Sequence, residues 1–447
     1  MCWLLLGPES WVTGDVSYFA HSLASEGRAG LAHTLVEYPL PAVGVLAIPW
    51  MLARLLLALP GGYAVLLALS AVCTDAVFAI LLHRASGGSR RRVAPATVVW
   101  LLAVPALGAT AYARFDLLPG VLLGCCLLAA ARHPRVAAGC ASAAAAVKLW
   151  PALVLPPLLT RVRGTAARRA CIAMVVGVAV VVGVSTVALA GWGRLFSPLR
   201  YAGTRGLQIE SVAATPAVLG WWHDPVAWPI GYASSNAFEI TGPGVRWLLV
   251  VSTVASLLLV LALLAAWAFA WGRRDRLRGR RGAVMMVWLT LAAVTGLMVT
   301  GRVLSPQYLL WLLPAAAAGL VVVRDRSLVA WSVLLLVTAG LTHLEFPVFY
   351  AGLTLRAPGK VAPAVVALVL RNLCLLVLTG WAWRRAVMSL SAEGVEDAQI
   401  VEPAEAAVPR HHRRALFTAQ RGVVGVRHVV GAKPAGRHDR GEDRPMP

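Results

Sequence analysis

The sequence contains little charge. Only 14% of its 447 residues are Asp, Glu, Lys or Arg, whereas a soluble globular protein carries about 25%. Hydrophobic residues make up 59% of the chain and mean hydropathy is +0.73. These proportions exclude a water-soluble globular domain and predict an integral membrane protein.

Cysteine is also scarce. The seven cysteines are an odd number, and those after Cys2 lie inside apolar segments without a C-x-x-C pair, which argues against a disulfide framework and against a zinc site. The sequence has no D-x-D or Asp-Asp pair, so we infer no divalent metal and no other cofactor. Residues 1–6 are too short for the hydrophobic region of a cleavable signal peptide.

Acidic residues are half as numerous as basic ones, 20 against 41, and the net charge is +21. In a soluble protein this excess would suggest a nucleic-acid partner. Here the basic residues lie in short loops between apolar runs, which is the positive-inside pattern of a multi-pass membrane protein. We therefore expect a bacterial plasma-membrane protein in contact with membrane lipids, and no nucleic-acid partner.

Long hydrophobic stretches fill the chain between Leu40 and Arg384. At about 20 apolar residues per crossing, they predict an all-α polytopic bundle of roughly ten to twelve transmembrane or re-entrant helices. We assign residues 1–385 to one membrane-embedded domain. Residues 386–447 are rich in Pro, Ala, Gly, Arg and Glu, a composition typical of a disordered segment, and we expect a disordered cytoplasmic tail there.

Arginine clusters orient the C-terminal half. They occur at 161–169, 273–281, 324–326 and 384–385, and the positive-inside rule assigns all four to the cytoplasmic side. The intervening spans are then predicted near 170–191, 246–271, 283–300, 308–323, 327–344 and 361–383. This leaves 192–245 as a long exterior loop, with 301–307 and 345–360 also outside.

The N-terminal half allows two topologies. An exterior loop over 7–39 followed by two full spans would put the arginines of 84–92 outside, against the same rule. We prefer a bent or re-entrant helix at 40–59, which Pro49 and Arg54 interrupt, because irregular backbone is tolerated at membrane depth when it lines a cavity in the protein. Residues 136–160, with Lys148 and several prolines, similarly predict two short helices that meet on the exterior side.

Twelve acidic residues precede the tail, and nine of them face the exterior in this topology. A carboxylate beside a bilayer is costly unless it is paired or functional, so the exterior face is predicted to be the working side. Solvated loop charge is the alternative for Glu9, Glu26, Asp224 and Glu239. Five polar clusters fall at exterior helix ends: Gly14–Tyr18 with Glu37–Pro41, Tyr112–Asp116 with Lys148–Pro151, Thr204–Ser211, Ser305–Trp311 and His343–Pro347.

Each cluster also has a structural alternative. Asp15 or Asp116 could cap a helix, Lys148 could snorkel to the interface, and Ser305 could cap a helix that begins at Pro306. His343 and Glu345 could satisfy each other. Arg205 and Glu210 could form a local loop salt bridge of about 0–1 kcal/mol.

In their order along the chain these segments resemble glycosyltransferase family 87. The resemblance spans residues 12–383 and rests on GDVSY, EYPLP, RFDLLPGVLLG, VKLWPALVLPPLL, RGLQIES, SPQYLLWLLP and HLEFPVFY. It implies the helical bundle of the C-type integral-membrane glycosyltransferases and a polyprenyl-phosphate-mannose donor. It also implies a glycolipid or polysaccharide acceptor outside the cytoplasm, and Asp15 as the catalytic base. A first transmembrane helix normally precedes the loop of that aspartate, but only fourteen residues do so here; either that helix is missing or the bundle has one fewer.

The residues fit this chemistry independently of the resemblance. A polyprenyl phosphosugar already carries a good leaving group, so an inverting transfer needs one base for the acceptor hydroxyl and cations for the phosphate. Arginine suits phosphate because its guanidinium makes two parallel hydrogen bonds, and Arg302 is a further exterior arginine. The predicted substrate-binding residues are Arg114, Asp116, Lys148, Arg205, Glu210, Gln307, Tyr308, His343 and Glu345.

Two other functions remain open from the sequence. A transporter or lipid flippase would carry ionisable residues near the bilayer midplane, and Asp75 is the one clear acid in the middle of a predicted span. A non-catalytic subunit of an envelope-assembly complex is the third possibility. A single exterior cavity that contains Asp15 would favour the enzyme.

Overall fold

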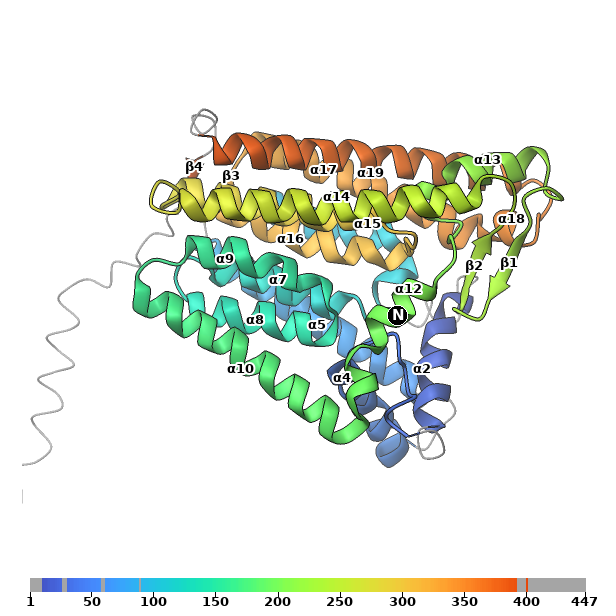
Figure 1. The fold of residues 1–447 in the computed structure, drawn as a ribbon, viewed down its shortest axis with the longest axis horizontal. Coiled ribbons are helices and arrows are strands. Elements are labelled where there is room, and N and C mark those ends of the chain that lie inside the picture. The colour runs from blue at the N-terminus through green and yellow to red at the C-terminus, as the bar shows by residue number, and fades with distance from the viewer. Residues whose placement is uncertain (1–9, 26–29, 58–60, 88–89, 392–398, 401–447) are drawn as a thin grey trace, which may run out of the picture. The chain divides into compact units, whose positions relative to one another are not determined.

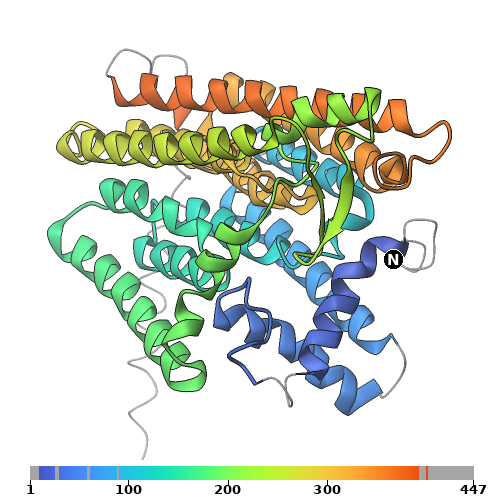
Figure 2. The same cartoon turned by 45° about the vertical axis from the view of Figure 1, so that its right-hand side comes forward.

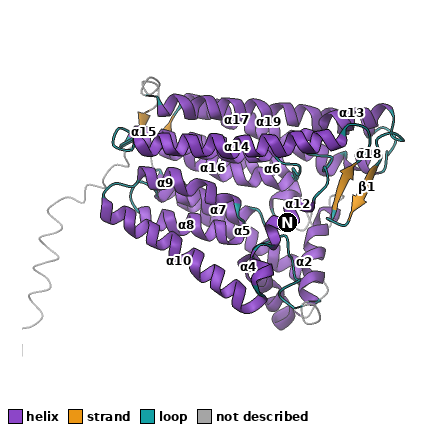
Figure 3. Ribbon diagram, viewed as in Figure 1, coloured by secondary structure: helices purple, strands orange, loops and turns teal. Residues whose placement is uncertain are grey.

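The structure is a computed structural model that describes residues 10–25, 30–57, 61–87, 90–391 and 399–400. The described part is almost entirely helical, with two short two-stranded sheets (Figure 3). The prediction of an all-α polytopic membrane protein is confirmed.

In the described part of the chain, seven helices are long and apolar enough to cross a bilayer. They are α5 (Gly62–Ala85), α6 (Arg90–Leu107) with the 3₁₀ turn η3 (Gly108–Ala111), α10 (Thr165–Ala190), α14 (Val245–Gly272), α15 (Arg280–Thr300), α17 (Arg326–His343) with the π-turn η7 (Leu344–Val348), and α19 (Val361–Leu390). Helix α15 is almost wholly buried. By contrast, α10 exposes Val180, Val181 and Val184, an apolar surface suited to lipid.

Shorter apolar helices complete the bundle. Three of them are α4 (Leu40–Leu52) with the π-turn η2 (Ala53–Leu57), α7 (Leu117–Ala129), and η6 (Pro306–Tyr308) with α16 (Leu309–Val322). With the seven long helices these give ten among the described residues, within the predicted range. The segment predicted to form two short helices contains α8 (Pro134–Val147), η4 (Trp150–Val154) and α9 (Leu155–Arg161), as the prolines indicated.

The arginine clusters lie together at one end of the bundle. Arg163 lies against Gly279 in the α14–α15 turn, Arg273 donates to the carbonyl of Leu390 at the end of α19, and Arg385 pairs with Asp325 at 2.7 Å. Strand β3 (Val323–Arg324) pairs with β4 (Gln399–Ile400) at the same end. The four clusters were predicted to lie on the same side of the membrane, and in the structure they lie at the same end of the bundle; the cytoplasmic assignment of that end stays a prediction.

The opposite end carries the smaller elements, and Figure 1 shows α13, α18 and the β1–β2 hairpin there. Residues 192–245 were predicted to be a loop, but they contain α11 (Trp192–Leu195), α12 (Ser197–Thr204), η5 (Val212–Ala214), α13 (Thr215–His223), β1 (Ile230–Ala233) and β2 (Ala237–Ile240). The backbone of Leu207 and Ile209 hydrogen-bonds to Ile240 and Phe238. This edge pairing fixes the segment that carries Arg205 and Glu210. Helix α18 (Tyr350–Thr354) follows η7.

The N-terminal elements η1 (Ser10–Thr13), α2 (Gly14–Ala24) and α4 group together, as Figures 1 and 2 both show in blue. Ala20 of α2 lines the same cavity as Gly61 and Tyr63 at the start of α5. The end of η2 and the start of α5 therefore lie against α2, and the re-entrant interpretation of residues 40–59 stays a prediction.

The domain boundary at 385 needs a small correction. Helix α19 continues to Leu390, and Ala386, Ser389 and Leu390 are buried, so the packed helix extends beyond the predicted start of the tail. Apart from residues 399–400, the predicted tail beyond residue 391 lies outside the described residues.

Candidate functional site

Asp15 forms an ion pair with Arg114. Helix α2 buries Val16, Phe19 and Leu23 on one face and thereby fixes the direction in which its first turn presents Asp15. Thr13 occupies the N-cap position, so the capping interpretation of Asp15 is not supported. The Asp15 side chain is 39% exposed and that of Arg114 is 7% exposed. The carboxylate is therefore accessible to a substrate, whereas the guanidinium that pairs with it is buried.

Asp116 and Lys148 form a second pair, at 2.5 Å between Nζ and Oδ1. Trp311 Nε1 donates to the same oxygen at 2.5 Å. Asp116 occupies the N-cap position of α7 but its side chain makes no capping hydrogen bond, so the capping alternative is wrong for Asp116. The Lys148 ammonium is engaged in the ion pair with Asp116.

Aromatic rings surround the Lys148 ammonium. It lies 5.5 Å from the ring centroid of Tyr38, 5.4 Å from that of Tyr308 and 5.2 Å from that of Trp311, within the range of cation–π attraction. Tyr308 stacks on Trp311 at 3.9 Å, and Trp150 stacks on its indole at 4.8 Å. The predicted Tyr308 thus belongs to an aromatic group around a fixed cation.

A buried group of charges adjoins the first pair. Arg371 Nη1 lies 3.6 Å from Glu345 Oε2 and its Nη2 donates to the backbone carbonyl of Glu210 at 2.6 Å. Gln208 donates to the Glu210 carboxylate. Burial, with the Glu345 charge added to it, raises the pKa of Glu210 well above its ordinary value, while the charges of Arg371 and Arg114 oppose the rise.

Arg371 was missed from the sequence. It is the only charged residue between 361 and 383 of α19, is 1% exposed, and lies next to the buried Asn372. An isolated cation within an apolar span indicates a functional residue or a buried acid partner. This pattern in the sequence could have identified Arg371.

Arg205 pairs with Glu239, at 3.6 Å between Nε and Oε1. Glu239 also accepts hydrogen bonds from Gly206 N and Ser235 Oγ, and its side chain is 17% exposed. The interpretation of Glu239 as solvated loop charge was wrong. The alternative of a local salt bridge holds for Arg205, but its partner is Glu239 and not Glu210.

Glu37 lies near this group. Tyr18 donates to its carboxylate at 2.9 Å. Burial raises the pKa of Glu37, and the Tyr18 hydrogen bond and the charges of Arg194 and Arg205 oppose that rise.

Two predicted residues lie at nearby helix ends. His343 ends α17, and its ring fills the space that a Cβ atom at position 108 would need, so Gly108 is required for this close approach. Gln307 lies in η6, directly before Tyr308. Ser305 occupies the N-cap position before Pro306 but makes no side-chain capping bond.

Arg302 and Asp75 have structural partners. Arg302 donates to the carbonyls of Gly203 and Arg205 and to Thr253 Oγ1, so it holds the α12 loop against α14 and does not join the phosphate-binding candidates. Asp75 accepts hydrogen bonds from Trp100 and Tyr112, at 2.7 and 2.6 Å. This acid of α5 is therefore engaged within the fold.

Residues distant in sequence thus lie near one another. The Arg114 guanidinium lies 5.7 Å from the ring centroid of Phe346, the residue that follows Glu345. The charge of Arg114 also acts on Glu210. The charges of Asp15 and Asp116 both act on Tyr38, which links the Asp15–Arg114 pair to the Lys148 group. Within the described residues, no three His, Cys, Asp or Glu side chains cluster in a way that could hold a metal ion.

The family model of glycosyltransferase family 87 matches residues 37–300, more than half of the chain. Arg114, Asp116, Lys148, Arg205 and Glu210 lie inside the matched segment, whereas Asp15 precedes it and the sites from Gln307 onward follow it. No curated protein and no solved structure matches the chain. The family match shows that the chain belongs to glycosyltransferase family 87. Together with the bundle of apolar helices, it identifies a multi-pass membrane glycosyltransferase.

Proposed function

We propose that this glycosyltransferase moves mannose from a polyprenyl-phosphate donor to a glycolipid or polysaccharide acceptor on the extracytoplasmic face of the bacterial plasma membrane, with inversion at the anomeric carbon. The observation that carries the proposal is the Asp15–Arg114 pair, in which an accessible carboxylate adjoins a cation that the fold holds in place. Inverting transfer from a phosphosugar needs this combination of base and phosphate ligand.

In this mechanism Asp15 takes the proton of the acceptor hydroxyl. The acceptor oxygen then forms a bond to the anomeric carbon as the bond from that carbon to the phosphate oxygen breaks, and polyprenyl phosphate leaves with the bonding electrons. Arg114 lies beside Asp15, where it can stabilise the charge that grows on the departing phosphate. Arg205 and Lys148 supply further positive charge.

The remaining residues are assigned to the sugar. The stacked rings of Tyr308 and Trp311 offer an apolar face to a sugar ring, and Asp116 holds Lys148 beside them. Gln307, His343, Glu210 and Glu345 are assigned to sugar hydroxyls. Among them, Glu210 Oε1 is buried without a hydrogen-bond partner.

The test uses purified full-length protein in lipid, with radiolabelled polyprenyl-phosphate mannose and envelope lipid extract as acceptor. We expect a labelled glycolipid or polysaccharide from this donor and none from nucleotide-linked mannose. Polyprenyl-phosphate glucose is the matched control for the sugar. Label transfer from glucose but not from mannose would overturn the sugar assignment, and transfer from the nucleotide donor would overturn the donor class.

A further inference from the structure

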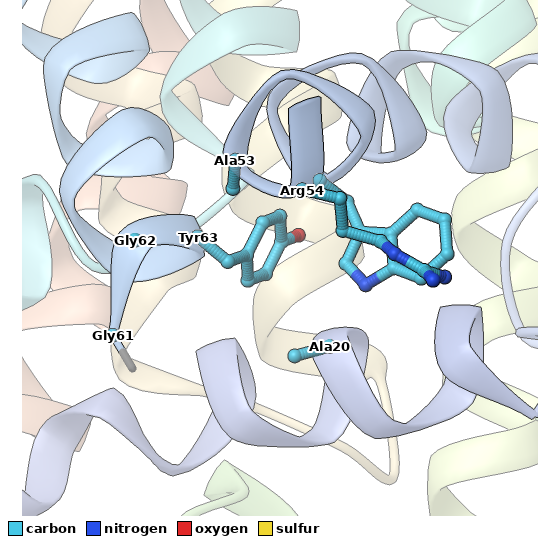
Figure 4. Close-up of a pocket in the computed structure, with 7 residues that line it drawn as sticks. Ala20, Ala53, Arg54, Gly61, Gly62 and Tyr63 are labelled. Carbon is cyan, nitrogen blue, oxygen red and sulfur yellow. The ribbon is translucent and has the colours of Figure 1, made fainter. Parts of the chain in front are cut away.

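A cavity lies between α2, η2 and the start of α5. It has a volume of about 380 Å³, and its lining includes Ala20, Trp50, Arg54, Gly61 and Tyr63 (Figure 4). This volume falls within the range of small-molecule sites, about 300–1,000 Å³. None of the residues proposed for sugar transfer lines it.

Arg54 supplies the charge of this cavity. It lies in the π-turn η2, which continues an apolar helix, and its guanidinium stands 4.9 Å from the ring centroid of Trp50. Among the described residues, no acidic side chain lines the cavity and no ion pair includes Arg54. A cation beside lipid without an acid partner favours an anionic ligand.

Tyr63 supplies an independent observation. Its side chain is 7% exposed, and its buried hydroxyl has no hydrogen-bond partner. Figure 4 shows this hydroxyl directed toward the Arg54 side chain. A buried hydroxyl without a partner is unfavourable, so its position indicates an occupant that accepts a hydrogen bond.

The surroundings identify the chemical class of that occupant. Met51, Leu55 and Leu56 on the same segment are 62%, 80% and 68% exposed, an apolar surface suited to acyl chains. A guanidinium and a hydroxyl donor together suit a phosphate group. We propose that the cavity binds the phosphate headgroup of an anionic membrane phospholipid, whose acyl chains lie along these exposed residues.

This site is separate from the Asp15–Arg114 pair. Ala20 follows Asp15 by five helical positions, which places the two residues about 140° apart around the axis of α2. A bound phospholipid would therefore contact α2 on a face other than the one that carries Asp15. The proposal does not depend on the sugar or the donor of the transfer reaction.

The test is native mass spectrometry of the full-length protein in detergent, titrated with phosphatidylglycerol. Arg54→Gln removes the charge and should weaken binding about tenfold, whereas Tyr63→Phe removes one hydrogen bond and should weaken it about threefold to tenfold. Because the Tyr63 hydroxyl has no partner in the fold, Tyr63→Phe is expected to remain folded. Arg246→Gln and Tyr232→Phe, at exposed positions, are the matched controls and should bind as the wild type does.

Ala20→Phe provides a further variant, because its ring would fill the cavity and should also weaken binding. Equal affinity of the wild type, Arg54→Gln and Tyr63→Phe would overturn the proposal. Three ligands distinguish the source of the phosphate. Glycerol phosphate binding as tightly as phosphatidylglycerol would overturn the lipid assignment, and equal binding of phosphatidylcholine would overturn the anionic preference. Displacement of phosphatidylglycerol by polyprenyl phosphate would overturn the separation of the two sites.

Discussion

Replacing Asp15 by Asn tests the proposed mechanism most directly. Asparagine keeps the size of the side chain and an oxygen that can face Arg114, but it cannot take a proton from the acceptor hydroxyl. We expect turnover to fall by about 10²–10⁴-fold, the usual contribution of a general base. The KM for the donor should remain near that of the wild type.

The structure separates this effect from a loss of stability. The Asp15 side chain is 39% exposed and solvent screens its charge, whereas Arg114 is 7% exposed. Asparagine keeps an oxygen that can accept a hydrogen bond from the buried guanidinium, so we expect a loss of about 1 kcal/mol in folding stability. A loss of 10²–10⁴-fold in turnover corresponds to about 3–5 kcal/mol in the activation barrier. The predicted effect on catalysis therefore exceeds the predicted effect on folding several-fold.

The assay is label transfer from polyprenyl-phosphate mannose at saturating donor, with thermal unfolding measured on the same preparations. Asp224→Asn is the matched control. In the described part of the chain, the Asp224 carboxylate accepts hydrogen bonds from the turn amides of Val226 and Ala227, and the asparagine side-chain oxygen can accept them too. Wild-type turnover in Asp15→Asn would refute the base assignment. A raised donor KM with unchanged kcat would instead show that Asp15 only positions Arg114.

Three further predictions follow from the charges. Lys148→Met leaves the 2% exposed Asp116 carboxylate without its cation and should destabilise the fold by about 3–5 kcal/mol; Lys148→Met combined with Asp116→Asn should recover part of the loss in thermal unfolding, and no recovery would contradict the buried pair. Burial raises the pKa of Glu210, so the folded state holds its proton to higher pH than the unfolded state, and stability should fall as pH rises above the unfolded value of about 4.3 toward the raised pKa. Glu210→Gln should flatten that part of the pH profile, and an unchanged slope would argue against it. Labelling from outside should modify a cysteine introduced at Asp224 but not one at Arg274, and the reverse result would invert the topology.

Composition and periodicity determine the class of fold, because each crossing of a bilayer requires about 20 apolar residues whose backbone polar groups are satisfied within the helix. The spans of α10, α14, α15, α17 and α19 were accordingly predicted close to their observed bounds. Pro49 and the prolines after Lys148 also predicted where helices are interrupted. These are local effects, and a sequence reports them directly.

Pairing depends on tertiary contacts that sequence spacing does not encode. Asp15 and Arg114 are nearly one hundred residues apart, and Arg205 pairs with Glu239 rather than with its neighbour Glu210 because the β1–β2 hairpin brings Glu239 to it. Arg371 belongs to the site because α19 packs against η7 and the segment that carries Glu210, and sequence spacing does not reveal this packing. The sequence thus determined which polar residues face one end of a helical bundle, and the packing of the helices decided which of them meet, because charge pairing acts over a few ångströms between segments that only the fold brings together.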